Sequence, residues 1–299
     1  MSVDAKNFQK TLTYTATASS RIIFQDLGEI AKIDKEIKKK KSQFSLVLII
    51  GMVGTCCSGF LSILLSALGS GFLSALGIIL PIGFAITALM GVILGSRYGS
   101  WDISNYRYEL SKKVLSLLNR DRNGKTDVNI NLILSPPTRK NKRVSTGSHP
   151  TRPNWKVELF RDQWLTLEGE FLDGNSFQLT LTEVYRTASG WKRSTRGKNK
   201  HKSKTKSKGS EITLKLNYSQ RRYGAIKVLK QDARGAIKLP EQVIMTKLII
   251  TDKVILLKVK VLPNISENKE TLYQTISMMF LSLYQILSLA KILTKKKNA

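Results

Sequence analysis

The sequence contains very few cysteines and histidines. Its only cysteines, Cys56 and Cys57, are adjacent, so they can form neither a disulfide framework nor a zinc site. Its two histidines, His149 and His201, lie among Lys, Arg, Ser and Gly, and not in an apolar setting that would fix a tautomer for general-base chemistry. These shortages argue against a Ser-His-Asp or Cys-His nucleophile. We therefore expect a protein that is not an enzyme and has no metal or cofactor.

Acidic residues are also scarce. The 299 residues include 21 Asp and Glu against 49 Lys and Arg, which gives a formal charge of +28 at pH 7. A balance this basic is typical of proteins that contact polyanions such as nucleic acid, anionic lipid or an acidic protein surface. It excludes an ordinary cytosolic protein of balanced charge.

Charged residues are completely absent from residues 42–96, a run of 55 positions. A bilayer core requires about 20 apolar helical residues per span, so this run predicts a transmembrane helical hairpin with spans at 44–68 and 72–94. Basic residues at 38–41 and at Arg97 flank the run, whereas the turn between the spans carries none. This distribution places both termini on the cytoplasmic side, or on the stromal side in a plastid.

Small residues recur at four-residue spacing in both spans. The predicted packing residues are Gly51, Thr55, Gly59, Gly83, Thr87, Gly91 and Gly95. This spacing lets helix backbones approach closely. It favours packing of the two helices on each other, and the alternative is an interface with a partner protein or a second copy. No ionisable residue lies in either span, which argues against an ion or proton pathway.

The segments around the hairpin are helical by periodicity. Apolar residues from Ile23 to Ile37 recur at helical spacing and predict an amphipathic helix that runs into the first span. Two interpretations of its lysines remain open: they bind anionic headgroups, or they only set the topology. The first twenty residues lack the apolar core of a cleaved secretory signal, so we expect none. A connecting helix is expected from about 102 to 118. The predicted organisation is a cytoplasmic N-terminal segment at 1–43, the hairpin at 44–96, a connecting segment at 97–125 and a basic β-rich domain at 126–299.

Alternation of apolar and polar residues begins near residue 126. It predicts strands at 128–134, 165–171, 177–181, 211–218, 223–230, 242–250 and 253–261. The Asp173-Gly174 pair predicts a hairpin turn. The fold class is therefore α+β, with an antiparallel β-sheet or small barrel of about seven or eight strands after the hairpin. The segment 135–154, rich in proline and basic residues, is expected to be an extended linker or long loop.

The C-terminal segment 271–290 is uncharged and long enough to span a membrane, but five Gln and Ser residues interrupt it. Its apolar residues form one helical stripe, so we favour an amphipathic helix packed against the sheet over a third span. A strand set closed by one C-terminal helix resembles pleckstrin-homology-like barrels in architecture. This resemblance implies no function.

The most distinctive stretch is the basic segment from Trp191 to Lys208, which holds nine cations and no acid. Six lysines occupy every second position from Lys198 to Lys208. In an extended conformation they would project to one side at intervals of about 6.6 to 6.8 Å, twice the rise per strand residue. The alternative is a disordered, solvated loop, because blocks of like charge repel each other.

These features predict a non-enzymatic membrane scaffold or assembly factor, whose basic domain docks on an acidic protein partner or an anionic lipid surface. The alternative is a membrane tether for RNA, ribosomes or DNA through non-specific phosphate contacts. A third hypothesis, an enzyme that uses Glu168 and Glu170, is weaker because paired surface carboxylates are common. The predicted binding residues are Lys192, Arg193, Arg196, Lys198, Lys200, Lys202, Lys204, Lys206, Lys208, Arg139, Lys140, Lys142, Arg143, Arg221 and Arg222.

Overall fold

The computed structural model describes residue 8 and residues 11–67, 71–99, 103–124, 126–193, 197–230 and 232–298. The chain divides into two compact units: Met1–Gly28 with Ser104–Ala299, and Glu29–Ile103. The helices are α2 (Ser20–Ala67), α3 (Gly71–Gly99), α4 (Asn105–Leu118), α5 (Gln220–Tyr223), α6 (Ala233–Ala236) and α7 (Lys269–Asn298), with short 3₁₀ turns η1 (Asn119–Asp121), η2 (Lys140–Lys142) and η3 (Gly224–Lys230). The strands are β1 (Thr13–Ser19), β2 (Asp127–Ile133), β3 (Arg143–Ser148), β4 (Trp155–Glu170), β5 (Ser176–Arg193), β6 (Asn199–Asn217), β7 (Val243–Ile250) and β8 (Val254–Val261).

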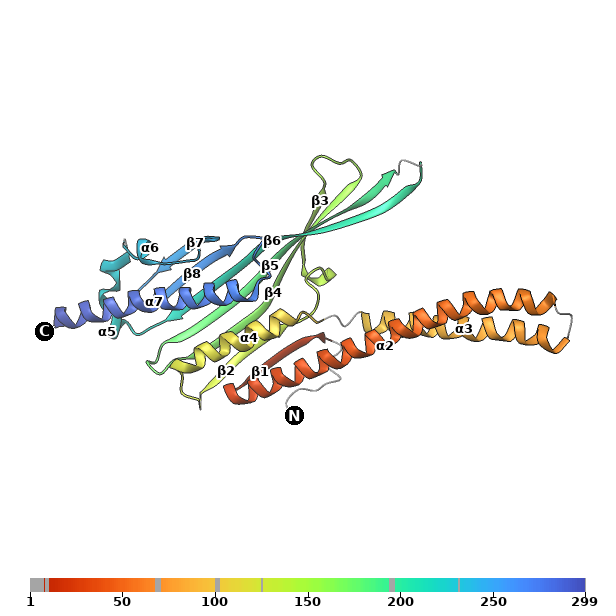
Figure 1. The fold of residues 1–299 in the computed structure, drawn as a ribbon. Coiled ribbons are helices and arrows are strands. Elements are labelled where there is room, and N and C mark those ends of the chain that lie inside the picture. The colour runs from red at the N-terminus through yellow and green to blue at the C-terminus, as the bar shows by residue number, and fades with distance from the viewer. Residues whose placement is uncertain are drawn as a thin grey trace. The chain divides into compact units, whose positions relative to one another are not determined.

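The smaller unit is an apolar pair of helices formed by α3 and the second part of α2 (Figure 1). The helices approach closely at Gly51, where an added Cβ would lie 2.6 Å from the backbone nitrogen of Ala88. At Gly91 a Cβ would lie 3.0 Å from Cα of Leu48. Small residues therefore bring the two backbones together, as expected from their spacing.

The predicted packing residues divide into two groups. Gly51 and Gly91 lie at the helix contact, whereas a Cβ on Gly59, Gly83 or Gly95 would meet no atom within 4 Å. The hydroxyl groups of Thr55 and Thr87 donate to carbonyl oxygens of their own helices, Gly51 O and Phe84 O, both at 2.7 Å. Packing between α2 and α3 accounts for the first group only. Of the predicted first span, Leu68 lies outside the described residues.

Three helices among the described residues are long and apolar enough to cross a membrane. These helical stretches are Ser20–Leu61, Ile79–Ser96 and Lys269–Thr294. The first two correspond to the predicted hairpin. The third is the C-terminal helix, whose apolar stripe is described below.

The larger unit contains an eight-stranded antiparallel sheet (Figure 1). The strand order is β1-β2-β4-β5-β6-β8-β7, and β3 pairs separately with β4. The ends of this order, β1 and β7, are edges, so the sheet is open. The alternative of a closed, pleckstrin-homology-like barrel is wrong. Helices cover the apolar face of the sheet, and its burial does not require closure.

The helices α4 and α7 lie over one face of the sheet (Figure 1). The α7 stripe of Leu272, Ile276, Met279, Leu283 and Leu287 is fully buried, because it faces the apolar sides of the strands. The prediction of an amphipathic helix packed against the sheet is confirmed. The Asp173-Gly174 turn is also confirmed: Gly174 has a φ of +77° and its N–H donates to Phe171 O at 3.0 Å.

The N-terminal residues form a strand that the sequence analysis did not predict. Strand β1 pairs with β2 along its whole length, from Thr13 opposite Ile133 to Ser19 opposite Asp127. The hydroxyl of Tyr14 donates to Asp26 at 2.7 Å, and Ile23 and Leu27 at the start of α2 are fully buried. The first part of the predicted amphipathic stripe therefore packs within its own unit.

Two other segments differ from expectation. Residues 223–230 form α5 and η3, because Tyr223 and Ile226 are buried at a spacing of three, which is a helical period. The predicted linker 135–154 contains η2 and strand β3, which pairs with β4 from Arg143 to Ser148. All six residues of β3 are exposed, so no apolar alternation marks it in the sequence.

We expect Gly51→Val to destabilise the helix pair, because the new Cβ would overlap the backbone of Ala88. Overpacking of this kind costs about 1–3 kcal/mol. The matched control is Gly83→Val, where the added atoms meet open space and the change in helix propensity is the same. The measurement is the midpoint temperature of unfolding of the detergent-solubilised protein, followed as loss of its monodisperse peak in size-exclusion chromatography. Equal midpoints for the two variants would contradict the packing described here.

Candidate functional site

The sheet continues beyond its helical cover as a projecting ribbon of strands (Figure 1). We call this ribbon the basic arm and define it as residues 143–148, 155–159, 186–193 and 199–208. None of the buried apolar side chains of the described chain belongs to these residues. The arm is therefore held by backbone pairing and not by a hydrophobic core.

The arm begins where three strands change register. Shifts occur between Gln163 and Leu165 in β4, and between Val184 and Tyr185 in β5. Opposite the second shift, Gly209 in β6 has a φ of +100°, and a Cβ there would lie 2.2 Å from Val261 O. Bulges of this kind bend strands and increase their twist. They turn the arm away from the part of the sheet that the helices cover.

The alternating lysines lie in the strand β6 of the arm. Lys200, Lys202, Lys204 and Lys206 are exposed and share one face, since alternate strand residues point the same way. Their partners across the β5–β6 pair are Lys192, Gly190, Ala188 and Arg186. The segment 191–208 is thus a β-hairpin in its described residues, and the alternative of a disordered loop is wrong for them. Lys198 is exposed immediately before β6, Arg193 lies opposite Asn199, and Arg196 lies outside the described residues.

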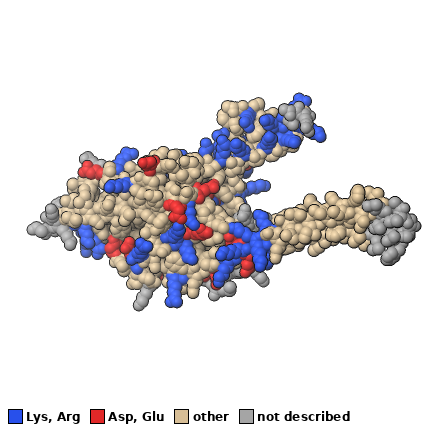
Figure 2. Space-filling view, viewed as in Figure 1, with Lys and Arg blue, Asp and Glu red and all other residues tan. Residues whose placement is uncertain are grey.

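The lysine face carries no negative charge among its described strand residues. Strand β4 adds Trp155, Val157 and Leu159 to this face, opposite Gly190, Ala188 and Arg186. The acidic residue of the arm, Glu158, belongs to the other face and is paired with Arg143 at 2.7 Å and Lys156 at 3.0 Å. Figure 2 shows Lys and Arg gathered over the projecting ribbon.

The other predicted binding residues do not form one surface with the lysine row. Lys142 is buried and paired with Asp162 at 2.8 Å, and Arg143 is engaged by Glu158. Arg222 donates to the carbonyl oxygen of Asp173, in the turn at the opposite end of β4 and β5 from the arm. Arg139, Lys140 and Arg221 are at least partly exposed, but lie outside the arm.

A buried cluster of charges at the base of the arm was not predicted. Arg107 of α4 donates to Asp162 at 2.8 Å and to Glu183 at 2.6 Å, and all three side chains are at most 2% exposed. Arg107 also donates to Ile133 O at 3.0 Å, and the hydroxyl of Tyr106 binds Glu183. The sequence did contain a signal: Asp162 and Glu183 occupy positions of the buried alternation in β4 and β5.

Burial dominates the electrostatics of this cluster. It raises the pKa of Glu183 to about 8, and the negative charge of Glu267 adds to this effect. Burial also lowers the pKa of Arg107 and of Lys142, against the opposing effect of Asp162. Such a closed, hydrogen-bonded cluster fixes the elements around it.

The carboxylates Glu168 and Glu170 differ in their surroundings. Glu168 accepts hydrogen bonds from the amides of Gln178 at 2.6 Å and Asn129 at 3.2 Å, while Glu170 is exposed at the end of β4. In the part of the chain that the structure describes, no group of three or more His, Cys, Asp or Glu residues is placed to hold a metal ion.

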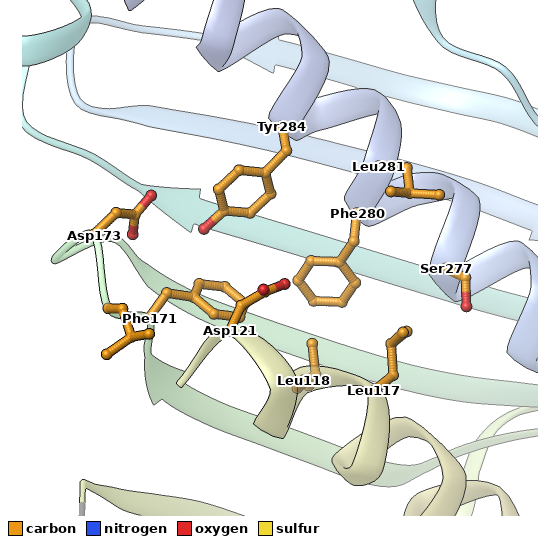
Figure 3. A pocket seen from close by; sticks show the side chains of 10 residues that line it. Leu117, Leu118, Asp121, Phe171, Asp173, Ser277, Phe280, Leu281 and Tyr284 are labelled. Atoms are coloured by element: carbon orange, nitrogen blue, oxygen red, sulfur yellow. The ribbon is translucent and has the colours of Figure 1, made fainter. Parts of the chain in front are cut away.

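An apolar cavity of about 450 Å³ lies at the other end of the sheet, between α4, the β4–β5 turn and α7 (Figure 3). Leu118, Phe171 and Phe280 line it, and the carboxylates of Asp121 and Asp173 lie at its rim. Cavities of this size and lining suit an apolar group beside a hydrogen-bond donor. It is separated from the arm by the length of β4.

Comparisons with known proteins give no relative: no protein-family model, curated protein or solved structure matches the chain.

The pKa of Glu183 predicts a specific dependence of stability on pH. Between about pH 4.5 and 8 the folded protein holds a proton on Glu183 that the unfolded chain has released. The free energy of unfolding should therefore fall by about 1.4 kcal/mol per pH unit across this window as pH rises. Glu183→Gln, which mimics the protonated form, should remove this contribution.

The measurement is urea unfolding of the two proteins in detergent at several pH values, followed by tryptophan fluorescence. Glu170→Gln is the control, because its carboxyl group is exposed. Parallel stability curves for the wild type and Glu183→Gln would contradict the prediction.

Proposed function

We propose that this chain is a non-enzymatic integral membrane scaffold or assembly factor. In this proposal α2 and α3 anchor the protein in the bilayer, with both termini on the cytoplasmic or stromal side. The basic arm docks on an acidic surface, which belongs to a protein partner or to anionic lipid. The observation that carries the proposal is the uncompensated row of cations on one face of an extended ribbon.

The arrangement of this row supports an anionic partner. Arg186 lies directly opposite Lys206, and Lys192 directly opposite Lys200. Like charges in directly opposed strand positions destabilise a sheet, and the arm has no apolar core to offset this repulsion. An acidic surface would relieve the repulsion and gain several charge-assisted contacts at once.

Apolar surface supports the membrane anchor. On α2, Phe60 is 72% exposed and Ile63 69%, and on α3, Ile79 is 63% and Leu89 62% exposed. Continuous apolar surface of this extent is stable in lipid and not in water. An anchored arm meets membrane proteins and lipids at high effective concentration, which favours them over a free polynucleotide.

Nucleic acid is the second candidate partner. Its support is the lysine interval of about 6.6 to 6.8 Å in a strand, which is close to the spacing of phosphates on an extended single strand. Trp191 near the tip of the arm is 63% exposed, and bases stack on exposed aromatic rings.

A pull-down from detergent-solubilised membranes distinguishes the two partners. We expect the tagged full-length protein to retain defined membrane proteins or anionic lipid after nuclease treatment at moderate salt. Changing the six alternating lysines from Lys198 to Lys208 to Ser should abolish this capture. The matched control also loses six exposed cations, but outside the arm: Lys112, Lys230, Arg234, Lys247, Lys253 and Lys260.

Capture by the wild type that disappears on nuclease treatment would overturn the scaffold proposal in favour of a nucleic-acid tether. Equal loss of capture in both six-site variants would show that net charge, and not the arm, holds the partner.

The proposed topology is tested with single cysteines in a background where Cys56 and Cys57 are replaced by Ala. Ser70→Cys, in the turn of the predicted hairpin, should react with a membrane-impermeant maleimide added outside intact cells or vesicles. Ser203→Cys in the arm should react only after the membrane is opened. Labelling of Ser203→Cys from outside would reverse the orientation, and extraction of the protein by alkaline carbonate would contradict the anchor.

A further inference from the structure

The lysine face of the arm is not flat throughout. A hollow of about 260 Å³ forms where the loop between β3 and β4 lies beside the paired strands β5 and β6. We call it the cationic hollow. Its lining residues are His149, Arg152, Trp155, Arg186, Ala188, Lys204, Lys206 and Lys208.

Trp155 is held rigidly at this hollow. A Cβ on Gly190 would lie 2.6 to 2.9 Å from three atoms of the indole, so one side of the ring packs directly on the strand β5. The guanidinium of Arg152 lies over the ring, 4.8 Å from its centroid. The indole Nε1 donates to Trp191 O at 3.3 Å. The ring is thus a fixed wall and leaves little room for a stacked base.

His149 supplies a hydrogen-bond donor. Its Nδ1 accepts a hydrogen bond from the backbone N–H of Thr151 at 3.2 Å. The proton of the neutral ring is therefore on Nε2, which can donate to an anion. Its backbone N–H donates to Trp155 O at 2.8 Å, which fixes the start of the loop beside the ring.

Five cations line the hollow, and none of its lining residues is acidic. Along the open row, successive lysines are about 6.6 to 6.8 Å apart and each meets one charge of an extended partner. In the hollow, Arg152 comes from the loop and Arg186 from β5, while three lysines come from β6. Cations that converge from three segments match closely spaced negative charges better than a single carboxylate or phosphate.

We propose that the cationic hollow binds a compact polyphosphate group: two or more neighbouring phosphates on one small molecule or on one lipid head group. This inference rests on the proposed docking of the arm on anionic surfaces and adds a discrete site to it. The lysine row provides weak contacts along an extended partner, and the hollow provides the selective one.

The first test is a calorimetric titration of the full-length protein in neutral detergent with inorganic tripolyphosphate. Ala188→Leu fills the hollow without changing charge, and we expect it to raise Kd about tenfold or more. Its control, Ser189→Leu, places the same side chain on the opposite face of β5. The pair Lys204→Gln and Lys206→Gln should weaken binding far more than the pair Lys198→Gln and Lys200→Gln, which lies outside the hollow.

The second test identifies the source of the phosphates. Co-sedimentation compares phosphatidylcholine vesicles that contain a phosphatidylinositol bisphosphate with vesicles that contain phosphatidylglycerol at equal charge. If a lipid head group is the ligand, Ala188→Leu should lose binding to the first vesicles and keep binding to the second. If the source is soluble, Ala188→Leu should lose only the binding of tripolyphosphate.

Two results would overturn the inference. One is unchanged tripolyphosphate binding in Ala188→Leu, and the other is equal weakening by the two lysine pairs; either leaves the docking of the arm intact as a delocalised effect. Failure of the docking proposal itself would give a different result. The wild type would then bind neither kind of anionic vesicle at low salt.

Discussion

The buried contacts of Arg107 with Asp162 and Glu183 are the interaction on which the arrangement of the larger unit depends. Asp162 and Glu183 lie directly opposite each other in β4 and β5, with both carboxyl groups buried. A buried Asp162 carboxylate without a cation would be very costly, and a protonated, buried Glu183 still needs a hydrogen-bond donor, so this pair of strands requires Arg107 above it. Arg107 brings α4 to this point, and Lys142 brings the start of β3. The cluster therefore marks the end of the helical cover, and the bulges next to it begin the basic arm.

The sequence predicts the parts of this fold that follow a simple period. The uncharged run gives α2 and α3, and alternation gives β2, β7, β8 and the core portions of β4 to β6. Strand β1 escapes detection because alanines at 16 and 18 contribute little apolar signal, and β3 because it has no buried face. For residues 199–208, the alternation of lysine with other polar residues left an extended strand and a disordered loop both open, and the structure shows the strand, which contains no core residue.

The proposed binding surface is predicted less completely than the fold. The lysine row is visible in the sequence, but Lys142 looks like any other member of a basic segment, and only the structure shows its burial against Asp162. The partners of Arg107 are 55 and 76 residues away, so no local pattern connects them. A polar residue in the buried phase of a strand is the available signal. Such a residue indicates that a buried partner is needed, but it does not identify which of the 49 Lys and Arg residues is that partner.

The order of the arm changes what its charge can do. A disordered basic segment must lose conformational entropy when it docks, and this loss offsets part of the attraction. In the arm, pairing with β5 and the bulge at Gly209 have already fixed the direction of the lysines. In the proposed docking, the same number of cations would therefore bind with a smaller entropic loss, and only to partners whose negative charges follow a straight row or fit the hollow beside it. Fixed geometry thus provides selectivity, although each individual contact is an exposed and weak charge pair.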